Sequence, residues 1–144
     1  FVGKDKGRKK ALQELKRTFE NEGLTTNFYI TATHPRYQKK GYQKKVSYEE
    51  SLSITLKSTC ILDYYTDPMA GLSIRAMESI FLGRKLITNN KTIREYDFYH
   101  PNNVYMLGRE QNSLQDFIKT PLAKIDKDIT DRYLFSNWLN RFGG

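Results

Sequence analysis

The stretch that decides the fold is GLSIRAMESIFLGRKLIT, from Gly71 to Thr88. Four apolar residues in it recur at helical spacing: Ala76, Met77, Ile80 and Phe81. Gly83 is a natural end for such a helix, and an apolar segment follows at once. The pattern therefore predicts a helix over residues 72–82 and a strand over residues 85–88.

The residues before this stretch complete a recognisable unit. Residues 59–65 are mostly apolar and predict a strand, which ends in the polar turn Thr66-Asp67-Pro68. A strand, a loop at a helix N-terminus, a helix and a second strand are typical of nucleotide-binding α/β proteins. Such proteins bind ligands at the carboxyl ends of their strands.

Helices and strands alternate along the rest of the chain. We expect further helices at about residues 7–21, from about 48 to before 59, 92–96, 113–119 and 129–141, and further strands at 28–32 and 104–107. Ser47 and Glu50 have the spacing of a capping box. The alternation predicts an α/β fold, a Rossmann-like three-layer sandwich with a mainly parallel sheet.

Length and composition set limits on the class of protein. The chain has 144 residues, 38% of them hydrophobic, which predicts one compact domain over residues 1–144. It has neither an apolar run of 18 residues nor a signal peptide, so we expect a cytoplasmic protein with Cys60 buried and reduced. Phe1 and Val2 resemble the end of a strand, and we therefore expect the sequence to be a piece of a longer protein.

The positive charge is concentrated in the first third of the chain. Residues 1–45 carry 12 of the 24 Lys and Arg residues and four of the 16 acidic ones. The net charge of +8 therefore belongs entirely to this segment. Such asymmetry predicts an anionic partner: phosphates, an acidic lipid surface or nucleic acid.

The helix after Gly71 contains the first candidate ligand-binding residues. Free backbone N–H groups at its start can bind a diphosphate, here from Gly71, Leu72 and Ser73. Glu78 can accept hydrogen bonds from ribose hydroxyls, and Arg75 lies three residues before it, away from the apolar stripe. The alternative is a surface ion pair between Arg75 and Glu78, contributing about 0.3–0.5 kcal/mol.

The loop near the start of the chain offers further cations. Lys4, Lys6 and Arg8 accompany Gly3 and Gly7, and could approach one phosphate together with the backbone. The alternative is a solvated, lysine-rich helix start. The two histidines each precede a proline and have no metal-ligand neighbours, so no metal site is predicted.

Three segments together resemble the C-terminal, donor-binding half of a GT-B glycosyltransferase, in the bacterial lipopolysaccharide and capsule branch related to CgeB-like proteins. FVGKDKGR (Phe1 to Arg8) is similar to that domain's first strand and loop. DYYTDPMAGLSIRAMESIFLGRKLITNN (Asp63 to Asn90) resembles its donor signature. YDFYHPNNVYML (Tyr96 to Leu107) resembles the segment that follows.

The resemblance implies that residues 1–144 bind a nucleoside-diphosphate sugar as a substrate, with no cofactor and no required metal. Glu78 would hold the ribose, Lys4 or Lys6 with Arg8 would contact the diphosphate, and Gly71 to Ser73 would lie at the sugar and phosphates. Many retaining relatives carry a second glutamate eight residues before this one, where this chain has Ala70. The resemblance therefore leaves retention or inversion open.

The resemblance also implies partners and a location. The donor would meet an N-terminal acceptor domain that this sequence lacks, and that missing half would hold the catalytic base, so no catalytic residue is assigned. We expect a hexosyl-type glycosyltransferase at the inner face of the cytoplasmic membrane, with the isolated domain inactive. The alternative is a non-catalytic basic module that binds nucleic acid or an anionic membrane, because tyrosines lie among the lysines of the first third.

Overall fold

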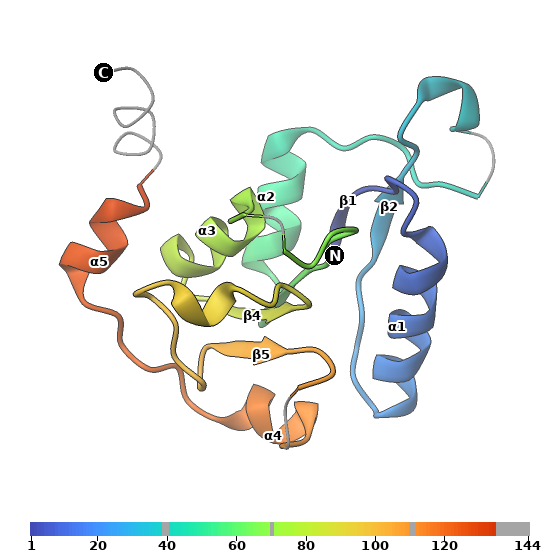
Figure 1. Ribbon diagram of the computed structural model, residues 1–144. Coiled ribbons are helices and arrows are strands. Elements are labelled where there is room, and N and C mark those ends of the chain that lie inside the picture. Colours follow the sequence, from blue (N-terminus) through green and yellow to red (C-terminus); the bar gives the residue numbers. More distant parts are fainter. Residues whose placement is uncertain (39–40, 70, 110–111, 135–144) are drawn as a thin grey trace. The chain divides into compact units, whose positions relative to one another are not determined.

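The computed structural model describes residues 1–38, 41–69, 71–109 and 112–134. Contacts within the chain form two compact units, Phe1–Lys57 and Ser58–Gly144, where a single domain was expected. In Figure 1 the first unit is coloured from blue to blue-green and the second from green to red. Each unit is described below by itself.

The first unit begins with a parallel βαβ arrangement. Strand β1 (Val2–Lys4) pairs with β2 (Tyr29–Thr31), and helix α1 (Lys9–Asn21) connects them. Leu12 and Phe19 lie seven residues apart on one face of α1, and both are buried. The Phe19 ring lies 6.4 Å from the Phe28 ring, so α1 packs beside the start of β2. The predicted helix and strand are confirmed.

A short 3-10 turn and a helix complete this unit. The turn η1 (Pro35–Tyr37) follows β2, and helix α2 (Tyr48–Leu56) ends the unit. The predicted capping box is confirmed: the Glu50 N–H donates to Ser47 Oγ at 3.1 Å, and the Ser47 N–H donates to Glu50 Oε2 at 2.6 Å. These two bonds satisfy N–H groups that the first helical turn would otherwise leave unpaired.

The second unit contains a parallel three-stranded sheet in the order β3-β4-β5. Its strands are β3 (Cys60–Asp63), β4 (Lys85–Thr88) and β5 (Val104–Met106). Helix α3 (Ile74–Phe81) connects the first two, and the 3-10 turn η2 (Ile93–Glu95) lies between the last two. Helices α4 (Leu114–Lys119) and α5 (Lys127–Arg132) follow β5.

Apolar side chains from strands and helices form the core of the second unit. It consists of Ile61, Ala76, Leu86, Ile93, Phe98, Val104 and Met106. Complete burial of a large apolar side chain contributes about 1.5–3 kcal/mol, so this cluster holds α3 and η2 against the sheet. The protein is thus α/β with parallel strands and packed helices, compatible with a Rossmann-like fold, as predicted. The strands form two sheets instead of one.

Some predicted boundaries differ from those of the structure. The strand expected over residues 59–65 ends at Asp63, because the chain then turns to meet the start of α3. The short helix expected at 92–96 is a 3-10 turn. The helix expected at 129–141 is α5, which begins at Lys127 and already ends at Arg132, and residues 135–141 lie outside the described range. No helix among the described residues is both long and apolar enough to cross a bilayer.

Candidate functional site

Helix α3 is tied to the carboxyl end of β3 through one serine. The Ser73 hydroxyl accepts a hydrogen bond from the Ala76 N–H at 3.1 Å and thereby caps the helix. The same hydroxyl donates to Asp63 Oδ2 at 2.5 Å. Asp63, the last residue of β3, is buried. The start of α3 is therefore held at the edge of the sheet where open α/β proteins bind ligands.

A tyrosine and an asparagine fix the loop between β3 and α3. The Ser73 N–H donates to Tyr65 Oη at 3.0 Å. The Tyr65 backbone makes two bonds with the Asn89 side chain, of 2.7 and 2.9 Å. Burial, assisted by the Asp63 charge, raises the pKa of Tyr65 to about 12, so the phenol remains protonated at neutral pH.

These hydrogen bonds leave fewer free backbone N–H groups in the loop than the sequence predicted. The Ser73 N–H, predicted to be free for a diphosphate, already has an acceptor in Tyr65. Leu72 packs against the core of the second unit, and Gly71 is exposed, with open space around its Cα. Of the three predicted residues, Gly71 is the one whose surroundings leave most room for a ligand.

Glu78 is buried, contrary to the expectation that it lies on the face of α3 opposite the apolar stripe. It is 4% exposed, and it belongs to a run of four buried residues from Ala76 to Ser79. Ile80 and Phe81, predicted to be buried, are partly exposed. Four consecutive buried residues turn through more than one face of a helix, so α3 does not have the simple two-sided pattern that the apolar spacing predicted.

The two oxygens of the Glu78 carboxylate differ in their hydrogen bonding. Oε2 accepts a hydrogen bond from Arg75 Nη1 at 2.6 Å, and this ion pair is largely shielded from solvent. Oε1 is buried and has no hydrogen-bond partner among the described residues. The pair is therefore not the exposed surface ion pair of the alternative, because the side chains of Arg75 and Glu78 are only 20% and 5% exposed.

The predicted cationic loop of the first unit is folded back on itself. Arg8 Nη2 donates to the Lys4 carbonyl at 3.1 Å, and the guanidinium lies 5.0 Å from the centre of the Phe1 ring. The Lys6 N–H donates to Thr33 Oγ1 at 2.8 Å. A Cβ on Gly3 would lie 3.1 Å from the Phe1 ring, so this glycine allows Phe1 to pack.

The described structure thus contains two candidate sites, one in each unit. Gly3, Lys4, Lys6 and Arg8 belong to the first unit, and Gly71, Leu72, Ser73, Arg75 and Glu78 to the second. In the second unit, hydrogen bonds join Ser73 to Asp63 at the end of β3, and Arg75 to Glu78. Glu78 does not line either of the two pockets described next.

A pocket of about 360 Å³ lies in the first unit, after the carboxyl ends of β1 and β2. Its polar lining residues are Lys4, Thr31, Thr33, Gln38, Lys44 and Lys45. The sequence analysis singled out only Lys4 among them. The basic composition of residues 36–45 was a signal for the other lysines, but it did not show that they share a cavity with Lys4.

A second pocket, of about 280 Å³, lies in the second unit, at the end of its sheet where β4 and β5 begin. Gly83 and Arg84 line it just before β4 begins, and Asn103 lines it just before β5 begins. The side chain of Asn103 exchanges two hydrogen bonds with the backbone of Ala123, of 2.8 and 2.9 Å. This pocket therefore lies under the segment after α4, away from Asp63 and Ser73.

No family model, curated protein or solved structure matches this chain. Within the described residues, no three His, Cys, Asp or Glu side chains gather in a way that could hold a metal ion.

Proposed function

We propose that this chain is the donor-binding half of a glycosyltransferase. It would bind a nucleoside-diphosphate sugar, whose sugar is transferred to a growing cell-surface polysaccharide or lipopolysaccharide. The single observation that carries the proposal is the Glu78 carboxylate, of which one oxygen is held by Arg75 and the other has no partner among the described residues.

A buried acceptor without a donor costs about 1–3 kcal/mol, so proteins rarely retain one without a reason. A ribose presents two neighbouring hydroxyl groups that would donate to Glu78 Oε1. Because Glu78 is 4% exposed and lines neither pocket, a ribose would reach this oxygen only if the residues that cover it move. Because Arg75 fixes the other oxygen, the pair supplies a positioned acceptor. A function in ligand binding would explain why α3 buries a charged acid.

The position of Glu78 in the fold also supports a nucleotide. It lies just over one turn into α3, whose N-terminus is attached to the carboxyl end of β3 through Ser73 and Asp63. The dipole of a helix favours negative charge at this end, as a diphosphate provides. The proposal assigns the phosphates to the exposed Gly71, just before the start of α3.

The rest of the proposal follows the resemblance. The acceptor domain and the catalytic base would belong to a part of the protein outside this sequence, and the reaction would need no bound metal. The enzyme would act in the cytoplasm, at the inner face of the membrane. The net charge of +8 in residues 1–45 suits a surface of anionic lipid.

Thermal unfolding with uridine, guanosine and cytidine diphosphates tests the proposal. One of them should raise the midpoint, since a ligand at 100 times its Kd stabilises a protein by about 2.7 kcal/mol. Glu78→Gln should abolish the protection. Glu95→Gln, which removes the same charge from an exposed position in the second unit, should retain it. Absence of protection by every diphosphate, or protection that survives Glu78→Gln, would contradict the proposal.

A basic, non-catalytic module remains the competing function. Two cations of the first unit lie over tyrosine rings, with Lys9 Nζ 3.9 Å from the centre of the Tyr42 ring and the Arg36 guanidinium 4.9 Å from that of Tyr37. Aromatic rings among cations also occur in proteins that bind single-stranded nucleic acid. Salt-sensitive binding to oligonucleotides, without any response to nucleoside diphosphates, would favour this module.

A further inference from the structure

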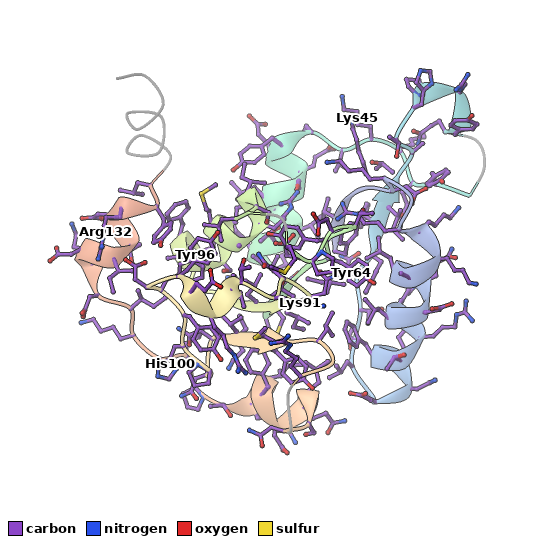
Figure 2. The ribbon with its side chains drawn as sticks, in the orientation of Figure 1. Lys45, Tyr64, Lys91, Tyr96, His100 and Arg132 are labelled. Atoms are coloured by element: carbon purple, nitrogen blue, oxygen red, sulfur yellow. The ribbon has the colours of Figure 1, made fainter. Side chains whose placement is uncertain are left out.

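The pocket of the first unit brings together lysines that are far apart in the sequence. Lys4 is the last residue of β1, while Lys44 and Lys45 belong to the segment between η1 and α2. The isolated bridge between Thr31 and Gln43 brings this segment beside the end of β2. Figure 2 labels Lys45 on the segment that leads into α2. Lys4, Lys44 and Lys45, whose side chains are all exposed, thus line one pocket.

The position of Lys44 and Lys45 is fixed by hydrogen bonds of the preceding residue. The Gln43 side chain accepts from the Ile30 N–H at 2.6 Å and donates to the Phe28 carbonyl at 2.6 Å. The Gln43 N–H donates to the Ile30 carbonyl at 3.0 Å. The two lysines therefore follow a residue that makes three hydrogen bonds, two with Ile30 of β2 and one with Phe28 just before it.

None of the described residues that line the pocket is acidic. The nearest acid in the sequence to Lys4 is Asp5, whose two oxygens accept from the Lys9 N–H and from Tyr42 Oη, both at 2.6 Å. Glu50, at the start of α2, is occupied by the capping box. The charge of the three lysines is therefore not balanced by a carboxylate within the cavity, and an anion would be attracted to it.

We infer that this pocket binds the phosphate group of a phosphate monoester. The three lysines supply the positive charge that a dianion requires, and the Thr33 hydroxyl supplies a further donor. The Gln38 amide nitrogen already donates to the Gln43 carbonyl at 2.5 Å. A volume of about 360 Å³ is within the range of small-molecule sites, so the phosphate has room for the group that it esterifies. Ala32 and Pro35 provide an apolar wall for that group.

The same phosphate chemistry occurs in a soluble metabolite and in the headgroup of an acidic lipid. The inference shares Lys4 with the contacts that the resemblance implies, but it does not rest on the proposed function, because it requires neither Glu78 nor a nucleotide. If the phosphate probes fail to bind, the result of the Glu78 test is unaffected. A negative Glu78 test likewise leaves the phosphate inference unaffected.

Binding to the whole chain tests the inference. Isothermal titration with glycerol 3-phosphate represents the soluble source, and sedimentation with phosphatidylcholine vesicles, with and without phosphatidic acid, represents the lipid. The variant Lys44→Gln/Lys45→Gln should weaken the binding about tenfold or more. The control Lys10→Gln/Lys57→Gln removes the same charge from two exposed positions of the first unit and should change it less than about twofold.

Each outcome either supports or overturns the phosphate-binding inference. Loss of glycerol 3-phosphate binding in the pocket variant alone supports a soluble ligand, and loss of vesicle binding in that variant alone supports a lipid headgroup. The inference fails if the wild-type chain binds neither, if the pocket variant binds as the wild type does, or if the control weakens binding equally. Binding to an oligonucleotide without any to the two phosphate probes also overturns it, because the lysines would then act as a surface for a polyanion.

Discussion

Cys60, expected to be buried, is only partly buried, and it shows how one side chain makes stability depend on pH. It is the first residue of β3 and lies opposite Lys85 in the register with β4. Burial raises the pKa of the Cys60 thiol from 9.0 to about 11, although the Lys85 charge opposes this shift. Burial also lowers the pKa of Lys85, whose Nζ donates to the Asn102 carbonyl at 2.6 Å. The two groups therefore have opposite effects on the stability at alkaline pH.

For Cys60 the direction of the pH effect on stability follows from the proton bound in each state. Between pH 9 and 11 the folded state keeps a proton that the unfolded chain loses, so this group lowers the free energy of unfolding as the pH rises. We predict that the Cys60 thiol lowers the free energy of unfolding by about 2 kcal/mol between pH 9 and 11, and that this decrease is absent in Cys60→Ala. Urea unfolding of both proteins at intervals from pH 8 to 11 measures it. Parallel curves for the two proteins would show that the thiol does not contribute.

At the scale of the element, the N-terminus of α3 depends on a hydroxyl with two functions. Ser73 Oγ accepts from the helix and donates to β3, whereas Ser113 Oγ caps α4 by accepting from the Asp116 N–H at 3.1 Å. Loss of a serine cap costs about 1 kcal/mol. We predict that Ser73→Ala destabilises the protein more than Ser113→Ala does, by about 1 kcal/mol for the additional bond to Asp63. Equal losses in chemical denaturation would contradict the function of Ser73 as a link.

The elements also show what the sequence could predict. Helix starts marked by serine caps, such as Ser47 and Ser113, and the strand of residues 85–88 are confirmed because their signals are local. The burial of Glu78 and the bond from Asp5 to Tyr42, 37 residues away, depend on tertiary packing. No periodicity encodes such contacts. For the same reason the sequence predicted a basic segment but not the pocket that it forms with Lys4.

At the scale of the whole molecule, each unit has its own apolar core. Leu12, Phe19, Phe28 and Ile30 are buried in the first unit, and the cluster around Leu86 and Ile93 lies entirely in the second. Proteins open in cooperative parts when contacts are concentrated within those parts. We therefore expect the two units to differ in their response to a cavity in one core.

Hydrogen exchange of two matched variants tests this expectation. Leu12 and Leu86 are both fully buried, and replacement of a buried leucine by alanine costs about 2–5 kcal/mol. Leu12→Ala should accelerate amide exchange in α1 and β2 while leaving β3, β4 and β5 protected. Leu86→Ala should produce the reverse pattern. If either variant accelerates exchange equally in all five of these elements, the chain unfolds as one cooperative body, and the two cores stabilise each other.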